Sequence, residues 1–273
     1  AGTAPSPPVV DDRGEAASRI ALDEFPAGRD AGDFFHAVLE RLDFGALDNP
    51  ALSTTVADFL PRFGIDSEHA SRASSALEAA LHTPLPHDRG VLRLDQIPRR
   101  DRTDEMGFLF PARSPRGAAA RATRLRTALV QHASTPAARE WARALGHRLQ
   151  MVPDGHVRGF IDLVFRHEGR WFVADYKSNH LGPHVDDYQR PQLERAMAEH
   201  DYFLQAHLYT LALVLHLRRR CPGFSYERDF GGVYYLFLRG MDPRWPQGTG
   251  VYFDRPAAAL IGALERAFVG GER

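Results

Sequence analysis

The chain has 273 residues, of which 44% are hydrophobic and 25% charged, and its formal net charge is −1. This length and hydrophobic content can form a sizeable core, as one large domain or as a domain with a smaller subdomain. The near-neutral charge excludes a chain that is basic throughout, and the single cysteine, Cys221, excludes an internal disulfide framework and a cysteine-rich metal site and is typical of a reducing cytoplasm.

The first half of the chain predicts mainly helices. Residues 1–18 are rich in Pro, Ala and small polar residues, without signal-peptide features, and we expect a flexible linker there. Apolar residues at helical spacing predict helices from about Asp30 to Phe44 and from Ser67 to Leu81. The next predicted elements are strands at Val91–Ile97 and Glu105–Phe110, a loop at Pro111–Gly117, and helices at Ala118–His132 and Pro136–Leu149.

The pattern changes at Gly155. Two β-rich runs, Val157–Phe165 and Trp171–Tyr176, flank a short segment that contains Gly169, which is typical of a hairpin. The remaining predicted elements are a helical region from Tyr188 to Arg220 with a break near His200, a strand at Gly232–Arg239 and a helix at Pro256–Phe268. The mixture predicts an α/β fold with a small central sheet between helices, and no apolar run reaches membrane-spanning length.

The hairpin carries an unusual group of charged residues. Because side chains alternate along a strand, Asp175 and Lys177 share one face. If Glu168-Gly169 forms a two-residue turn, counting outward along the strands places Asp162 directly opposite Asp175.

Two directly opposed carboxylates destabilise a sheet unless a cation compensates them. Carboxylate oxygens favour Mg²⁺, Mn²⁺ or Ca²⁺, and Lys177 beside them could neutralise a phosphate or orient a water molecule. The pattern therefore predicts phosphodiester hydrolysis. Asp-x-Lys alone is more often a pair of surface residues, but an acid inside the apolar run from Phe160 to Val164 fits poorly without a role.

The two segments 159–162 and 175–179 resemble the PD-(D/E)xK nuclease superfamily. More closely, they are similar to the C-terminal nuclease domain of the RecB subunit of bacterial RecBCD helicase–nucleases. Segments 176–182, 205–209 and 230–240 carry the same resemblance, which is clear from about residue 155 to 242 and weaker around Phe25-Pro26 and Phe35-His36.

The resemblance implies a site. Asp162 and Asp175 would bind the metal together with the main-chain carbonyl of Tyr176, and Lys177 would be the catalytic lysine. His36 matches the family's histidine ligand, and Glu105 its additional acidic residue among the catalytic groups. The expected ion is Mg²⁺, with Mn²⁺ as an alternative and Ca²⁺ as an inhibitor.

Gln205 and Tyr209 match a Gln-x-x-x-Tyr element expected to contact DNA.

Other interpretations compete at several positions. By pattern alone, His36 is a core histidine on an apolar helix face, Glu105 is a solvated loop acid, and Tyr209 packs in the core.

The implied fold is a central mixed sheet flanked by helices with an N-terminal helical portion. We expect a linker at 1–18 and a single nuclease domain at 19–273, with its helical portion at 19–150 and its catalytic core at 151–273.

The implied function is that of an exodeoxyribonuclease V type enzyme in double-strand break processing and recombination, in the bacterial cytoplasm and away from the membrane. Its partners would be DNA, mainly single-stranded, the helicase domains of the parent chain, and RecC-like and RecD-like subunits. The chain has no phosphate-loop motif, so the motor would lie before residue 1.

Two alternatives stay open. One is a non-catalytic, nuclease-like DNA-binding or scaffolding domain, and the other a metal-dependent hydrolase of another phosphate ester. Retention of both acids and Lys177 argues against the first, and the lack of a small-ligand motif argues against the second.

Overall fold

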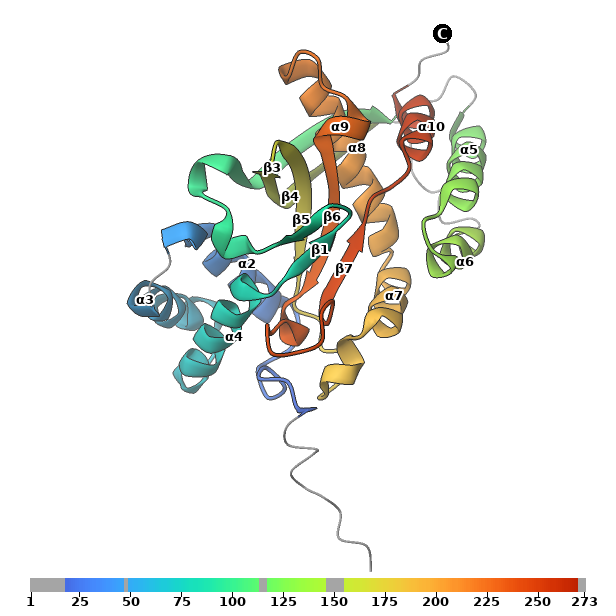
Figure 1. Ribbon diagram of the computed structural model, residues 1–273. Helices are drawn as coiled ribbons and strands as arrows, with labels where there is room; N and C mark the ends of the chain where they lie inside the picture. Colours follow the sequence, from blue (N-terminus) through green and yellow to red (C-terminus); the bar gives the residue numbers. More distant parts are fainter. Residues whose placement is uncertain (1–17, 47–48, 113–116, 146–154, 270–273) are drawn as a thin grey trace, which may run out of the picture.

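The computed structural model describes residues 18–46, 49–112, 117–145 and 155–269. Within these ranges, helices pack on both faces of a five-stranded sheet, which makes three layers (Figure 1). The predicted α/β fold with a central mixed sheet flanked by helices is confirmed. The predicted linker lies, apart from Ser18, outside the described residues.

The central sheet has the strand order β3-β4-β5-β6-β7. Its first three strands are antiparallel, β5 and β6 are parallel, and β6 and β7 are antiparallel. All residues of β6 are buried, as expected for a strand covered on both faces. The strand bounds are Arg102–Ala112 for β3, Gly155–His167 for β4, Arg170–Lys177 for β5, Phe230–Phe237 for β6 and Val251–Asp254 for β7.

The β4–β5 hairpin has the predicted register. His167 pairs with Arg170, so the connection is the two-residue turn Glu168-Gly169. Both turn residues have positive φ, 47° and 78°, as a type I′ turn requires. Regular pairing ends at Leu163–Ala174, one row before the two predicted metal-binding acids.

One face of the sheet is covered by the N-terminal helices and a small hairpin. The elements are α2 (Arg29–Arg41), α3 (Asn49–Phe59), α4 (Ala70–His82), β1 (Leu85–His87) and β2 (Gly90–Leu92). Helix α2 buries Phe34, Phe35, Val38 and Leu39, the apolar stripe that predicted it. These side chains join Leu163, Phe172 and Tyr176 of the sheet in one hydrophobic cluster.

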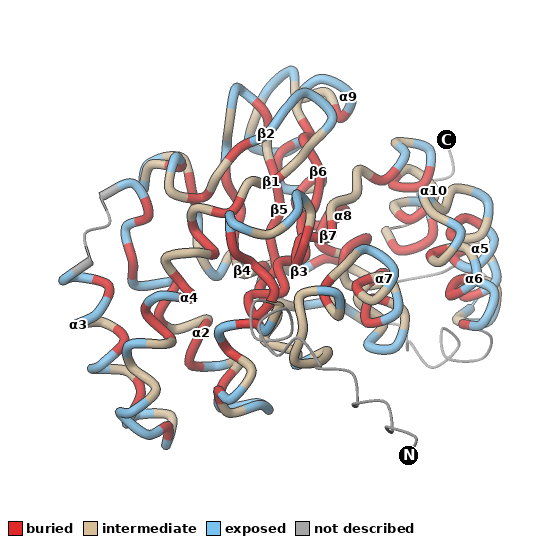
Figure 2. Tube along the Cα trace, turned by 60° about the horizontal axis from the view of Figure 1, so that its bottom comes forward, coloured by how far each residue is buried: buried red, intermediate tan, exposed pale blue. Residues whose placement is uncertain are grey.

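The opposite face packs against the C-terminal helices. The elements are α5 (Gly117–His132), α6 (Pro136–Ala144), α7 (Arg190–Glu199), α8 (Tyr202–Arg220) and α10 (Ala258–Phe268), with the short α9 (Tyr226–Asp229) near the start of β6. Their buried residues form a second cluster with Val164, Val173 and Tyr235 of the sheet. Figure 2 shows the buried positions concentrated along the central strands, while the outer helices alternate between buried and exposed residues.

Most predicted elements are present, and some are wrong in part. The strand predicted at Gly232–Arg239 is Phe230–Phe237, followed by a 3-10 helix at Leu238–Gly240, and β3 extends through Pro111 and Ala112 of the predicted loop.

The predicted strand Val91–Ile97 is a strand only to Leu92, and Leu94–Gln96 forms a 3-10 helix. A local ion pair between Arg93 and Asp95, with Nε to Oδ1 at 3.0 Å, stabilises this turn. The predicted break near His200 is confirmed, because Asp201 adopts a left-handed conformation between α7 and α8.

A buried arginine ties the N-terminal segment to the sheet. Arg239, just after β6, is 3% exposed. Its guanidinium donates to the carbonyl oxygens of Ser178 at 2.8 Å and Phe25 at 3.0 Å, and also to those of Leu22 and Pro26. One side chain therefore joins segment 22–26 to the loop that follows β5.

We expect Arg239→Met to lower the free energy of unfolding by about 2–4 kcal/mol, because it leaves several buried carbonyls without donors. Urea denaturation measures this change. The control is Arg244→Met, since that side chain is 75% exposed and pairs with Asp242. If the two substitutions lower the free energy of unfolding equally, the stabilising role given to Arg239 is wrong.

Candidate metal centre

Three acidic residues occupy one row of the sheet, at the point where the regular pairing is interrupted. Extending the observed registers by one row places Glu105 of β3 opposite Asp162 of β4, and Asp162 opposite Asp175 of β5. The β3–β4 ladder skips this row, and the β4–β5 ladder ends before it. Like charges in one row repel, so side-chain contacts replace regular pairing at this point.

Glu105 has an unusual backbone conformation. Its φ is 51°, in the left-handed region that non-glycine residues seldom adopt. Beyond it the environment of the strands changes: Leu163 belongs to the cluster under α2, whereas Ile161 and Phe110 belong to the cluster under α8. The strained residue thus marks the row at which the alternation of side chains along β4 shifts, so that Ile161 and Leu163, two residues apart, face different cores.

Asp162 links two strands and a helix. Its Oδ2 atom accepts a hydrogen bond from the backbone N–H of Tyr176 at 2.8 Å, and it lies 3.4 Å from Nδ1 of His36. The carboxylate therefore takes the place of a main-chain acceptor opposite β5.

His36 reaches the same point from α2. Its Nε2 atom donates to the carbonyl oxygen of Tyr176 at 3.1 Å. Burial lowers the pKa of His36, but the hydrogen bond and negative charge of Asp162 outweigh burial, so the pKa is raised overall. One ligand atom each from His36, Glu105 and Asp162 lie within 4.8 Å of one another.

Asp175 lies deeper, outside that group of three, and contacts the lysine. It is 1% exposed, and burial together with the charge of Asp162 raises its pKa to about 7, although Lys177 opposes the shift. Nζ of Lys177 lies 2.6 Å from Oδ2 of Asp175, an ion-pair contact without hydrogen-bond geometry.

Lys177 is held from the α8 side. Oε1 of Gln205 accepts from Nζ of Lys177 at 3.1 Å and from the hydroxyl of Tyr235 at 3.0 Å. The ring of Tyr202 lies 3.9 Å from the same Nζ, at cation–π distance. Nε2 of Gln205 donates to the hydroxyl of Tyr209 at 2.8 Å.

Two of these residues were missed from the sequence. Tyr202 lies three residues before Gln205, a helical spacing that could have indicated it. Tyr235 is paired with Asp175 across the parallel strands β5 and β6, and no local pattern shows that pairing. Tyr209 is 8% exposed and packs against the ring of Phe108, while DNA contact by Gln205 and Tyr209 stays a prediction.

The donor set fits a hard divalent cation. It offers carboxylate oxygens, one main-chain carbonyl and one imidazole, a mixture suited to Mg²⁺ or Mn²⁺ and poor for thiophilic metals. The electrostatics of the site also favour a cation. Burial, Asp162 and Glu40 raise the pKa of Glu105, and Asp162 also raises the pKa of Asp175. A bound cation would offset this negative charge.

Comparisons with known proteins agree with this geometry. The family model of the PD-(D/E)XK nuclease superfamily matches residues 14–260. The chain is 38% identical over 247 residues to the RecBCD enzyme subunit RecB of Escherichia coli (strain K12), which covers 90% of this chain and 20% of that protein.

Two further relatives are also RecB subunits of RecBCD enzymes. RecB of Haemophilus influenzae is 34% identical, with 90% of this chain and 19% of the relative covered. RecB of Mycobacterium tuberculosis (strain CDC 1551 / Oshkosh) is 36% identical, with 89% and 24% covered. The chain thus spans roughly a fifth of the length of these curated relatives.

The raised pKa of Asp175 predicts a pH-dependent stability. Between the unfolded value of 3.8 and about 7, the folded chain retains a proton that the unfolded chain releases, so the free energy of unfolding falls as pH rises through this window. The free energy of unfolding of Asp175→Asn, relative to that of the wild type, should therefore rise by at least about 1 kcal/mol from about pH 5 to about pH 8 in EDTA.

Urea denaturation at the two pH values measures this difference. Near neutral pH, Mg²⁺ should reduce the advantage in free energy of unfolding that the variant has over the wild type, because the ion stabilises the wild type alone. A difference that stays constant or shrinks as pH rises in EDTA would refute the electrostatic argument.

Proposed function

Because the chain belongs to the PD-(D/E)XK nuclease superfamily, we propose that it is a magnesium-dependent nuclease that hydrolyses phosphodiester bonds of DNA. It is a RecB-like nuclease domain. The observation that carries the proposal is the interrupted row of carboxylates, Glu105, Asp162 and Asp175, with the ammonium of Lys177 beside it.

The proposed metal ligands are Asp162, Asp175, the carbonyl of Tyr176 and His36, with Glu105 as an additional acid. A bound Mg²⁺ lowers the pKa of water and offsets the charge that develops on the phosphate. Asp162 and His36 already contact each other and Tyr176, so these groups are held in place by protein contacts. Such preorganisation favours catalysis because little reorganisation is needed during the reaction.

Lys177 is proposed to act on the attacking water or on a phosphate oxygen. An ammonium has three N–H donors. Gln205 accepts one of them and Asp175 offsets the charge, so a donor remains for the reacting group. The ring of Tyr202 limits the movement of the long side chain. This arrangement disfavours the alternative of a non-catalytic scaffold.

The biological setting is also a proposal. The relatives are named as RecB subunits of RecBCD enzymes. By analogy, we infer that the chain cleaves mainly single-stranded DNA, beside helicase domains of its parent chain and RecC-like and RecD-like subunits, during break processing and recombination. The bacterial cytoplasm is the inferred location. No helix among the described residues is long and apolar enough to cross a membrane.

We further propose one nuclease domain at 19–273, divided into a helical portion at 19–150 and a catalytic core at 151–273. The helical portion supplies His36 from α2 and Glu105 from β3, which pairs with β4 of the core. Both portions would therefore be needed for activity.

Asp175→Ala should reduce Mg²⁺-dependent cleavage of linear single-stranded DNA by at least about 10³-fold, because it removes a metal ligand and the ion-pair partner of Lys177. Gel assays with Mg²⁺ and with EDTA measure the loss, and circular dichroism checks the fold. Wild-type cleavage by the folded variant would disprove the catalytic assignment.

Lys177→Ala separates binding of the metal from catalysis. The substitution should abolish cleavage and leave Mg²⁺ affinity within about threefold, since the ligands remain in place. Isothermal titration calorimetry measures the affinity. If metal binding disappears with the lysine, the proposed division of roles is wrong.

A further inference from the structure

An exposed apolar surface begins beside the candidate metal centre. Within the part of the chain that the structure describes, Phe160 and Leu109 are exposed to 61% and 64%, which is unusual for side chains of this size. Both lie on the β3–β4 ribbon, where Gly107 pairs with Phe160 and Leu109 pairs with Arg158. A Cβ atom on Gly107 would lie 3.4 Å from the ring of Phe160, so this ring lies over the backbone of β3.

The distance to the metal centre is short. Phe160 is two residues from Asp162, and Gly107 is two residues from Glu105 on the paired strand. Two residues of a strand span about 7 Å. The exposed ring therefore lies two rows of the ribbon away from the acids.

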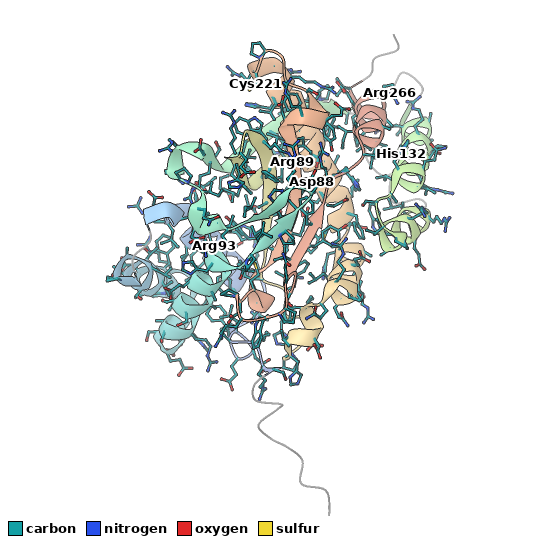
Figure 3. All side chains as sticks on the ribbon, in the orientation of Figure 1. Asp88, Arg89, Arg93, His132, Cys221 and Arg266 are labelled. Carbon is teal, nitrogen blue, oxygen red and sulfur yellow. The ribbon has the colours of Figure 1, made fainter. Side chains whose placement is uncertain are left out.

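A basic groove adjoins this surface. A pocket of about 210 Å³ is bounded on one side by residues 106–110 of β3, including Gly107 and Leu109, and on the other by the last turns of α8 with Arg219 and Arg220. In Figure 3, Cys221 marks this end of α8.

The arginines of the groove are available for a ligand. Among the described residues, no carboxylate lies within ion-pair distance of Arg219, Arg220 or Arg158, whereas the neighbouring Arg218 pairs with Glu265. All three are exposed.

Because Met106 and Phe108 pack against the cluster under α8, alternation along β3 turns Leu109 to the opposite face, so Arg219 and Arg220 lie across β3 from the apolar side chains. Among the described residues, no carboxylate pairs with their positive charge.

We propose that Phe160, Leu109, Arg158, Arg219 and Arg220 form a strand-binding surface that holds single-stranded nucleic acid next to the metal centre. The proposal rests on the proposed nuclease function. Unstacked bases would lie on Phe160 and Leu109, and phosphates would lie near the arginines, the combination that proteins use for single strands. Duplex DNA keeps its base faces inside the helix and cannot use the exposed ring.

The surface assigns strand binding to residues other than Gln205 and Tyr209. Gln205 contacts both Lys177 and Tyr209, and Tyr209 is buried. Phe160 and the arginines instead face solvent. From Glu105 to Leu109 the strand covers four residues, about 14 Å, so the surface would contact nucleotides close to the scissile phosphate.

The test is binding of a fluorescent oligothymidylate of about 20 nucleotides to the 273-residue chain in EDTA, followed by fluorescence anisotropy. Phe160→Ala should weaken binding about tenfold, because it removes a stacking platform. Arg219→Ala with Arg220→Ala should weaken binding and reduce the slope of log K against log salt by about 1.4, at about 0.7 for each phosphate contact.

Matched controls lie on the β1–β2 hairpin. Val91 is 49% exposed, Arg89 is an exposed arginine at the hairpin turn, and neither lines the groove between β3 and α8. Val91→Ala and Arg89→Ala should leave binding unchanged. Duplex DNA of the same length should bind Phe160→Ala and Val91→Ala as it binds the wild type, because stacked bases cannot use the exposed ring.

The outcomes separate the two proposals. If the wild type binds the strand through these residues but cleaves no DNA with Mg²⁺, the proposed strand-binding surface is supported and the proposed nuclease function is refuted. If the wild type cleaves DNA and the Phe160 and arginine variants bind the strand as the wild type does, only the proposed strand-binding surface is refuted. Absence of strand binding by the wild type also overturns it, as does an equal loss in the hairpin controls.

Discussion

Repulsion among three carboxylates in one row of a sheet is the constraint around which this structure is arranged. Glu105, Asp162 and Asp175 occupy neighbouring strands where regular pairing would bring like charges together. The protein offsets part of this charge from different directions: the N–H of Tyr176 and the imidazole of His36 contact Asp162, and the ammonium of Lys177 contacts Asp175. Burial and, after it, the charge of Asp162 raise the pKa of Asp175, and the contribution of Asp162 shows that the compensation is incomplete.

Each layer of the fold contributes one part of this compensation. Helix α2 packs its phenylalanines under one face of the sheet and thereby places His36 at the row. Helix α8 packs under the other face and places Tyr202 and Gln205 against Lys177. The left-handed backbone of Glu105 is strain stored at the same point, and such strain persists only where surrounding packing stabilises it.

The β3–β4 ribbon joins the proposed chemistry to the proposed substrate path. Glu105 and Asp162 lie at one row, and Phe160 and Leu109 follow on the same two strands with solvent-exposed side chains. A ribbon that carries both groups would keep the substrate at a constant distance from the ligands, because strands are more rigid than loops. The chain covers roughly a fifth of the length of its RecB relatives.

The sequence by itself determined the features that depend on neighbouring residues. Alternation along β5 predicted that Asp175 and Lys177 share a face, and the Glu168-Gly169 turn predicted the hairpin register, because turn type and strand period are local properties. His36 and Glu105 were indicated by family resemblance, and their roles stay proposals. Only the tertiary structure decided that α2 brings His36 to Tyr176, that Tyr235 lies beside Asp175, and that Phe160 stays uncovered, because these depend on packing between segments far apart in the chain. Local pattern failed at Val91–Ile97 for the same reason: β-branched and apolar residues favour a strand, but burial of Leu94 and Ile97 in the core bends the chain into a 3-10 turn.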